Sequence, residues 1–508
     1  MRRAFSPFSA AALAARVSAI ALLLLGLSAY DWPQFGFNSQ HSSDNTQESI
    51  INASNVSSLK RFLLVSLPST ADGAPAFLSN VLTASGIKSL VFVTTKDGHI
   101  MALDWRTGAT VWSHLNNAGP HYTTSSPVID PNRQFVYSYG LDGHVHKYQV
   151  GDGNEITTGG WPELATFKPD VEKGSSALSV ATAKNSTSYL YVTNGGYPGD
   201  AGDYQGHVTA INLSNGSQNV FNTMCSDKPV HFTETSPDCS GGVQSAIWAR
   251  PGVIYDPDTD KIYMGTGNGT YDPAKHEWGD TVFSLNPDGT GAGGNPLDSY
   301  TPTNFQALQN GDIDLGSTAP ALLPNTGKYP HLAVQGGKDA MLHLINLDNL
   351  SGHQPAGPGF TGGEIFSTPV QQGGEILTMP AVWVNPADSS TWVFVANGNG
   401  LSGLKLNLNG GGNPSLVKMW KINSGGTSPI VANGVLYYVA GGNIWALDPV
   451  SHAQLWHNTQ IGGIHWESPI VVNGLLYVTD NNNHLSGYSL NGLVPGLTNQ
   501  YFIPTIGR

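Results

Sequence analysis

Charged residues are scarce in this sequence, and basic residues are scarcer than acidic ones. Of the 508 residues, 12% are charged, with 36 Asp and Glu against 23 Lys and Arg, for a net charge of −13. A surface of this sign repels phosphate backbones, so we expect no nucleic-acid partner. Helical periodicity is also missing beyond the N-terminus, which argues against a helical domain.

Cysteine is nearly absent, since Cys225 and Cys239 are the only two in the chain. In an exported protein, this pair predicts a disulfide that closes a surface loop, with free thiols or a metal-binding pair as alternatives. The sequence contains no Cys-x-x-Cys-His motif, which excludes a c-type haem attached covalently to this chain.

The N-terminus has an apolar run that is too short to span a bilayer comfortably. Residues 17–27 are apolar, Arg2, Arg3 and Arg16 supply positive charge, and small residues follow at Ser28 and Ala29. This pattern is typical of a signal peptide, so we predict that residues 1–29 are removed and that the protein is periplasmic or secreted. An uncleaved anchor is the alternative. No cysteine lies near the cleavage site, so we expect no membrane anchor.

Glycine and proline are abundant, with 61 and 32 residues, and a repeated unit accounts for many of them. Residues 90–112 read as a strand, an Asp-Gly turn, a second strand, a Gly turn and a short strand that ends in Trp112. One such unit cannot bury both faces, so stacked units must share a core. Near-copies follow at 142–156, 206–221, 279–289, 338–352, 398–420, 441–456 and 482–492.

This periodicity predicts an all-β fold, an eight-bladed β-propeller of four-stranded antiparallel blades. We expect residues 30–508 to form a single propeller domain. A strand at residues 55–65 is expected to pair with the last blade near residues 475–490, because this closure removes exposed sheet edges.

The repeat resembles that of a known family. Ala102-Leu-Asp-x-x-Thr-Gly108, ending in Trp112, is similar to the tryptophan-docking repeat of the quinoprotein alcohol dehydrogenases. These are eight-bladed propellers that hold pyrroloquinoline quinone and a metal ion. Non-catalytic scaffold propellers carry the same repeat, so the repeat implies the fold rather than the activity.

Three further segments resemble the family's cofactor site. Residues 248–257, 262–268 and 278–280 are similar to the segment that holds the tryptophan under the quinone ring and the metal-binding Asn. The resemblance implies that Trp248 is the stacking residue and Asn268 a metal ligand. Residues 311–316 imply Asp314 as catalytic base and metal ligand, and residues 336–346 imply Lys338 as the contact to the quinone oxygens.

The residue types suit this chemistry. A hard divalent cation prefers oxygen ligands, and as a Lewis acid it polarises a quinone carbonyl. A carboxylate such as Asp314 takes the alcohol proton, while Lys338 places positive charge where the reduced quinone becomes negative. Gly316 stands where lanthanide-using members have a second Asp, so calcium is the expected metal.

The sequence departs from the family pattern at two places. Residues 195–206 match the region of the metal-binding Glu but contain no Glu, so Asp200 or Asp203 is the expected substitute. The adjacent Cys-Cys pair of many members is also missing, and residues 123–126 lie about where it would be.

Each of these residues also has a simpler interpretation. Asn268 lies in a Gly-Asn-Gly turn sequence, and Asp314 could satisfy backbone amides in a loop. Trp248 could be an ordinary blade tryptophan. Lys338 could be the solvated tip of a hairpin, as we expect for Lys96.

Three functions follow from the sequence. The first is an exported oxidoreductase that oxidises an alcohol, polyol or sugar and passes electrons to a separate acceptor such as a cytochrome c. The second is a propeller that lost the cofactor and serves as a binding or assembly scaffold in the cell envelope. The third, a propeller that binds or cleaves glycans, rests only on acidic loops.

Overall fold

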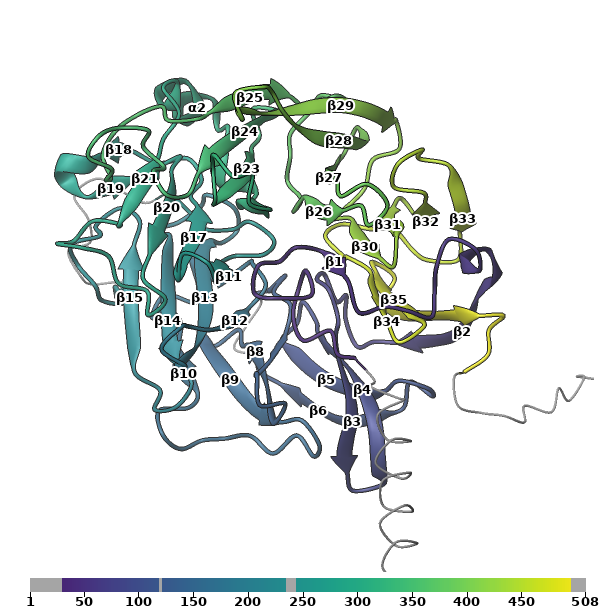
Figure 1. Ribbon diagram of the computed structural model, residues 1–508. Helices are drawn as coiled ribbons and strands as arrows, with labels where there is room; N and C mark the ends of the chain where they lie inside the picture. The colour runs from purple at the N-terminus through teal and green to yellow at the C-terminus, as the bar shows by residue number, and fades with distance from the viewer. Residues whose placement is uncertain (1–29, 118–120, 234–243, 495–508) are drawn as a thin grey trace, which may run out of the picture.

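Eight antiparallel sheets stand in a ring around a central channel (Figure 1). The computed structural model describes residues 30–117, 121–233 and 244–494. The predicted signal peptide, residues 1–29, and Cys239 lie outside the described residues. The prediction of an eight-bladed propeller is confirmed.

The first half of the ring consists of blades 1 to 4. Their strands are β3 (Ala76–Thr83), β4 (Gly86–Thr94), β5 (His99–Asp104) and β6 (Thr110–Leu115) in blade 1; β7 (Val128–Ile129), β8 (Phe135–Tyr139), β9 (His144–Gln149) and β10 (Glu163–Leu164) in blade 2; β11 (Glu172–Gly174), β12 (Ser179–Thr182), β13 (Ser188–Gly196), β14 (His207–Asn212) and β15 (Gln218–Asn222) in blade 3; and β16 (Ile254–Asp256), β17 (Lys261–Gly265), β20 (Val282–Leu285) and β21 (Asp298–Tyr300) in blade 4.

The second half of the ring is more regular. Its strands are β22 (Ala321–Leu323), β23 (Leu332–Gly336), β24 (Met341–Asn346) and β25 (Phe366–Pro369) in blade 5; β26 (Ala381–Val384), β27 (Thr391–Asn397), β28 (Gly400–Leu408) and β29 (Pro414–Ile422) in blade 6; β30 (Ile430–Ala432), β31 (Val435–Ala440), β32 (Asn443–Leu447) and β33 (Gln454–Asn458) in blade 7; and β34 (Ile470–Val472), β35 (Leu475–Asp480), β36 (His484–Leu490) and β2 (Leu59–Ser66) in blade 8.

A few short elements lie outside this pattern. They are β1 (Asp44–Asn45), which pairs in parallel with β30, the ribbon of β18 (Tyr271–Asp272) and β19 (Glu277–Trp278), the helix α2 (Phe305–Gly311), and the 3-10 turns η1 (Val56–Ser58), η2 (Pro273–Lys275) and η3 (Leu315–Ser317). Within the described ranges, no helix combines the length and the apolar character needed to cross a membrane.

Tryptophans in the outer strands of blades 1, 6 and 7 bond each of these blades to the next one. The indole N–H of Trp112 donates to the carbonyl of Val150 in the next blade at 2.9 Å, and Trp420 donates to Pro449 at 3.0 Å. Buried aliphatic and aromatic side chains of neighbouring sheets pack between these contacts. The terminal Trp of the repeat is therefore an inter-blade contact.

The ring closes where the N-terminal strand joins the last blade. β2 pairs antiparallel with β36, with Leu59 opposite Leu490 and Ser66 opposite His484. Trp456 of blade 7 donates to the carbonyl of Leu59 at 3.1 Å, so the same docking contact spans the closure. The predicted pairing of the N-terminal strand is confirmed, and it supplies the outer strand that completes blade 8.

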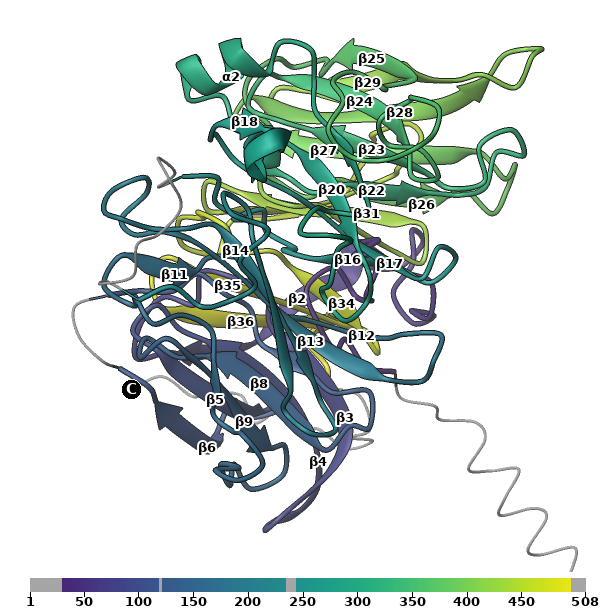
Figure 2. The ribbon, with the colours of Figure 1, turned by 90° about the vertical axis from the view of Figure 1, so that its left-hand side faces the viewer.

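One hairpin extends beyond the ring. The view in Figure 2 shows the strands β3 and β4 reaching away from the other blades. Leu82 and Ile87, which are paired across the tip, are 75% and 72% exposed. These two side chains contribute nothing to the shared core.

Candidate cofactor site

A cavity of about 330 Å³ lies at one end of the channel. Its walls are formed by the segments that precede the innermost strands and by the turns between the second and third strands of the blades. The lining residues are Lys96, Tyr122, Thr124, Lys173, Ser175, Gly195, Gly196, Gly199, Asp200, Ala246, Trp248, Arg250, Asp314, Lys338, His465 and Trp466. Four residues predicted from the sequence, Trp248, Asp314, Lys338 and Asp200, therefore lie at one cavity.

Asp314 and Lys338 form a close ion pair in the wall. Asp314 precedes η3 and Lys338 lies in the turn between β23 and β24, with 2.5 Å between the ammonium nitrogen and Oδ2. The Asp314 side chain is 6% exposed and the Lys338 side chain 16%. Burial raises the pKa of Asp314, and the opposing effect of the Lys338 charge is only partial. Lys338 is thus no solvated hairpin tip.

Trp248 and Asn268 surround this pair. The Lys338 ammonium lies 5.6 Å from the centroid of the Trp248 ring, and the backbone N–H of Asn268 donates to Asp314 Oδ1. Gly267 lies close to both Asp314 and Trp248. A Cβ at this position would come within 2.5 Å of Asp314 Oδ1 and 3.2 Å of the Trp248 indole nitrogen. The segment from blade 4 therefore approaches the Asp314 carboxylate closely because it has glycine at this position.

The two acids expected to replace the missing Glu lie in different surroundings. Asp200 lines the cavity and accepts a hydrogen bond from the Tyr204 hydroxyl at 2.6 Å. The Asp203 side chain is 55% exposed, lies 3.8 Å from Lys168 and does not line the cavity. Of the two, only Asp200 is placed where it can approach the site. Within the described part of the chain, no three His, Cys, Asp or Glu side chains are grouped closely enough to hold a metal on their own.

Asp280, to which no role was predicted from the sequence, lies next to the segment that holds Asp314. It is 1% exposed, and its Oδ1 accepts the backbone N–H of Leu315 at 3.0 Å, next to Asp314. Its Oδ2 is buried without a hydrogen-bond partner among the described residues, and burial raises its pKa to about 8. The sequence contained a sign of this role, because Asp280 is the last residue of a segment, 278–280, that resembles the family.

Comparisons with known proteins show similarity to quinone-dependent dehydrogenases and to an assembly factor. The PQQ_2 family model, described as outer membrane protein assembly factor BamB, matches residues 67–228. The dehydrogenase subunit of an alcohol dehydrogenase (quinone) from Komagataeibacter europaeus is 24% identical over 334 residues, which cover 58% of this chain and 41% of the relative. A second such subunit, from Gluconobacter oxydans (strain 621H), is 23% identical over 278 residues, covering 50% of this chain and 29% of the relative.

Solved structures show the same fold at lower identity. The quinohemoprotein alcohol dehydrogenase ADHIIG from Pseudomonas putida HK5 superposes with a TM-score of 0.64 and 14% identity, covering 91% of this chain and 81% of that chain. A europium-containing methanol dehydrogenase gives 0.63 and 14%, covering 93% of this chain and all of that one. The chain is thus similar in sequence to the dehydrogenase subunits of quinone-dependent alcohol dehydrogenases and has the propeller fold of the solved quinoprotein dehydrogenases. It spans less than half the length of the curated relatives that it matches.

A second wall of the cavity is rich in cations, and the sequence did not predict it. Lys96 lies 3.0 Å from Asp72, whose side chain is fully buried, so the expectation that Lys96 is a solvated hairpin tip is wrong. His465 lies 2.7 Å from the same carboxylate. Burial alone would raise the pKa of Asp72, but His465, Arg250 and Lys96 together lower it.

Two further cations complete this wall. Arg250 is 2% exposed and donates to the carbonyls of Thr124 at 2.7 Å and Ser175 at 2.9 Å, while its Nε has no partner among the described residues. The Lys173 ammonium lies 4.0 Å from the centroid of the Tyr122 ring, and burial lowers its pKa to about 8. The positive charges of Arg250 and Lys96 lower the pKa of Lys173 further, and the charge of Asp72 opposes them.

The segment at the place of the family's Cys-Cys pair ties two blades together. The hydroxyls of Thr123 and Thr124 donate to the carbonyls of Gly174 and Ser175 at 2.7 and 2.8 Å. Tyr122, at the start of this segment, contributes an aromatic ring to the cavity. Elsewhere, Cys225 is buried, but its expected partner Cys239 lies outside the described residues, so the disulfide stays a prediction.

Proposed function

We propose that the quinoprotein-like propeller binds pyrroloquinoline quinone and Ca²⁺ in this cavity and oxidises an alcohol, polyol or sugar. Electrons would pass to a separate acceptor such as a cytochrome c, in the periplasm or outside the cell. The observation that supports this most is the convergence of Trp248, Asp314 and Lys338. They come from separate segments of the sequence, and their residue types suit a quinone site.

The cavity suits the quinone in size and charge. Pyrroloquinoline quinone is a flat, fused-ring molecule with three carboxylates, and ligand pockets of such size begin at about 300 Å³. The cavity of about 330 Å³ has an indole in one wall, a phenol ring in another and four cations around it: Lys96, Lys173, Arg250 and Lys338. The unpartnered Arg250 Nε and the lowered pKa of Lys173 indicate positive charge that an anionic ligand would stabilise.

The oxygen donors near Asp314 suit calcium. Asp314 and the side-chain oxygen of Asn268 would hold the ion, and Asp200, which lines the cavity, would supply a third protein ligand. Calcium takes six to eight oxygen ligands, so oxygens of the bound quinone and of water would complete the set. When bound, the quinone supplies a hydride acceptor and calcium a Lewis acid.

The protein's own residues then have distinct roles. Asp314 takes the proton of the substrate hydroxyl, and its raised pKa makes it a better base near neutral pH than an ordinary Asp. The Asn268 N–H and the Lys338 ammonium fix its two oxygens, which orients the carboxylate. Trp248 provides a flat surface that sets the plane of a bound ring, and Asp280 holds the backbone beside Asp314.

Dye reduction by the protein loaded with quinone and Ca²⁺ tests this proposal. A panel of alcohols, polyols and sugars would be assayed with Asp314→Asn and with Asp388→Asn, a matched change at an exposed Asp outside the cavity. Substrate-dependent reduction that falls about 10²- to 10⁴-fold in Asp314→Asn alone supports the proposal. Equal rates in both variants would overturn the role of Asp314.

The scaffold function remains a second candidate because of one observation. The family model that matches residues 67–228 is described as an outer membrane protein assembly factor. A scaffold needs the ring but neither the Asp314–Lys338 pair nor the cation wall. A folded protein that binds no quinone and reduces no dye would favour it.

A further inference from the structure

The second region that suggests a binding function lies at the other end of the channel. There, residues 31–45, which we call the strap, run beneath the innermost strands of the ring. Eight equivalent residues of the innermost strands face the strap. Each is the second residue of its strand and is paired with a residue of the neighbouring strand. These residues are Phe77, Ile129, Val180, Tyr255, Leu322, Val382, Val431 and Val471.

The strap makes a hydrogen bond to seven of these eight positions. Backbone groups of the strap bond the backbones of Phe77, Ile129, Tyr255, Val382 and Val431, and the side chains of Gln34 and Asn45 bond the backbones of Val180 and Val471. In six of the seven, the blade residue donates its N–H to the strap, and Val471 instead accepts a hydrogen bond from Asn45. The strap thus provides hydrogen-bond partners for backbone groups at the inner edges of seven of the eight sheets.

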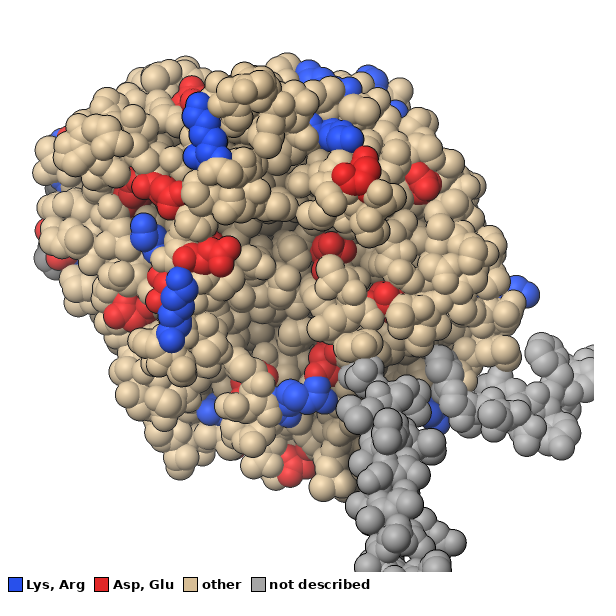
Figure 3. Space-filling view, in the orientation of Figure 1, with Lys and Arg blue, Asp and Glu red and all other residues tan. Residues whose placement is uncertain are grey.

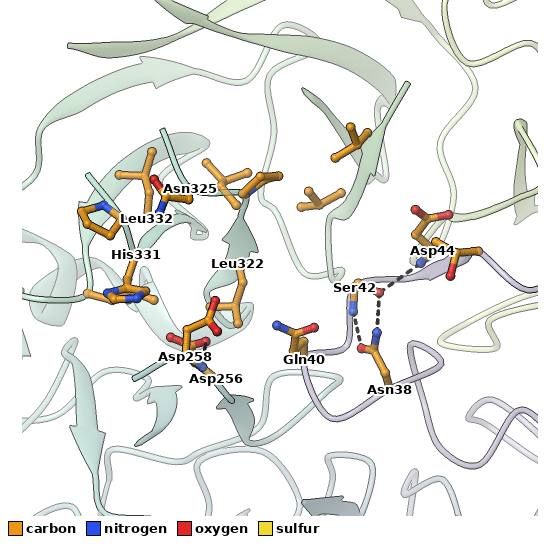
Figure 4. A pocket seen from close by; sticks show the side chains of 17 residues that line it. Asn38, Gln40, Ser42, Asp44, Asp256, Asp258, Leu322, Asn325, His331 and Leu332 are labelled. Carbon is orange, nitrogen blue, oxygen red and sulfur yellow. Dashed lines mark hydrogen bonds between the residues drawn. The ribbon is translucent and has the colours of Figure 1, made fainter. Parts of the chain in front are cut away.

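Blade 5 is the exception. Ser39 accepts from Tyr255 of blade 4 at 2.9 Å, and Ser42 accepts from Val382 of blade 6 at 3.1 Å, so the strap passes blade 5 within two residues. Among the described residues, none of the strap bonds the backbone of Leu322. A cavity of about 320 Å³ opens at this place, with Leu322 on one side and Gln40 and Ser42 on the other (Figure 4).

The chemistry around this blade 5 cavity is apolar inside and acidic at its edge. Leu322, Leu323 and Val382 supply apolar surface, and Asp44, Asp256 and Asp258 supply carboxylates. Among the described residues, no Lys or Arg lines the cavity. Figure 3 shows acidic side chains on either side of a hollow near the centre of this face.

One of these carboxylates has no counter-charge. Asp256 accepts hydrogen bonds from the Asp258 N–H at 3.0 Å and the Thr259 hydroxyl at 2.8 Å. By contrast, no hydrogen bond or ion pair reaches the Asp44 carboxylate from the described residues, and burial raises its pKa to about 7. A half-buried carboxylate without a partner is costly, and a cation placed beside it would offset that cost.

We propose that the blade 5 cavity binds a short, extended peptide segment of a partner protein that carries a basic side chain. The peptide would accept the Leu322 N–H through a backbone carbonyl, as the strap does in the other blades. Its apolar side chain would pack on Leu322 and Val382, and its Lys or Arg would pair with Asp44 and Asp258. This is strand addition at an open sheet edge, in which backbone bonds supply affinity and side-chain contacts supply specificity. The proposal is independent of the quinone site.

Two synthetic peptides test this inference on the full chain. The probes are fluorescein-labelled Val-Lys-Val-Lys-Val and its charge-reversed twin Val-Glu-Val-Glu-Val, both with blocked ends, followed by fluorescence anisotropy at low ionic strength. We expect saturable binding of the Lys peptide only, weakened at least fivefold in Asp44→Asn and at least tenfold in Leu322→Pro, which removes the N–H at a sheet edge. The charge-matched control Asp152→Asn should bind like the unmodified protein. Added salt should weaken the Lys peptide.

Hydrogen exchange provides a second readout that does not depend on a variant folding. The Lys peptide should slow exchange in the peptide fragment that contains Leu322, and leave fragments that contain Val431 unchanged because the strap already protects them. Equal affinity for both peptides, equal binding in Leu322→Pro, or binding without protection at Leu322 would each overturn the proposal. Loss of quinone binding alone would leave it standing.

Discussion

The two ends of the channel are built on the same eight inner strands but have opposite chemistry. At the cofactor end, Lys96, Lys173, Arg250 and Lys338 surround a cavity of about 330 Å³. At the strap end, Asp44, Asp256 and Asp258 line a cavity of about 320 Å³ that lacks Lys and Arg. The repeated units form the ring, while the loops at one end and the strap at the other supply the side chains that make the two ends chemically different.

The largest effect should follow from a change at the cofactor end. Replacing Asp314 with Asn removes the base but keeps the shape of the side chain, so dye reduction should fall about 10²- to 10⁴-fold. Thermal unfolding and quinone binding should change much less, because the Lys338 ammonium keeps an oxygen partner. A parallel loss of stability and of quinone binding would instead make Asp314 a structural residue.

Removing a docking tryptophan should weaken both ends together. Trp112 is 7% exposed, packs near Phe92 and Tyr148, and donates to Val150. Trp112→Ala should lower the free energy of unfolding by about 3–5 kcal/mol, measured by denaturant titration. Trp445→Ala, at a partly buried Trp that donates no indole hydrogen bond to the next blade, serves as the comparison and should cost less. Equal losses would contradict a special role for the docking bond.

A change in the strap should be smaller and confined to its own end. Gln34 is buried and exchanges two hydrogen bonds with Val180, at 2.9 and 3.3 Å. Gln34→Ala leaves the Val180 amide without a partner, which should cost about 1–3 kcal/mol of unfolding free energy. The quinone affinity should stay within twofold. A large fall in quinone affinity would show that the two ends are coupled.

The cation wall predicts a pH dependence of quinone binding. Lys173 attracts an anion only when it is protonated, and its pKa in the free protein is lowered to about 8. Quinone affinity should therefore be full below pH 8 and decline as the pH rises through that value. Lys173→Met should weaken binding at pH 7 and remove most of the decline between pH 7 and pH 9. An affinity that rises with pH would contradict the assignment.

The smallest effect is expected outside both ends. Leu82 and Ile87 are exposed at the tip of the β3–β4 hairpin. The double change of Leu82 and Ile87 to Lys should alter the unfolding free energy by less than about 0.5 kcal/mol, because surface changes away from contacts are nearly neutral. A larger loss in thermal unfolding would show that this tip packs against something in the folded protein.

Much of the ring could be predicted from the sequence because its signals are local. Asp97 and Gly98 mark a hairpin turn, and Gly98 adopts the positive φ of 89° that such a turn needs. The Trp at the end of three of the units, Trp112, Trp420 and Trp456, marked the docking contacts. The closing strand followed from the need to remove an open edge, and it lies where the sequence placed it.

The site was predicted only in part, for physical reasons. Trp248, Asp314 and Lys338 could be found through their segments, but the turn sequence around Lys96 gives no sign that this hairpin turn faces a cavity. Asp200 and Asp203 could not be told apart until the loop was placed. The strap contacts escaped prediction, since most join backbone groups and leave little mark on residue type.

Binding of the quinone is the measurement that tests the account most directly. Purified protein would be titrated with pyrroloquinoline quinone and Ca²⁺ while tryptophan fluorescence is followed, with Trp248→Phe as the matched variant. The account predicts saturable quenching at a ratio of one to one, with weaker quenching in Trp248→Phe. No quenching at roughly 100 μM quinone, a concentration that would detect a binding free energy of only about −5.5 kcal/mol, in a protein that unfolds cooperatively, would contradict it.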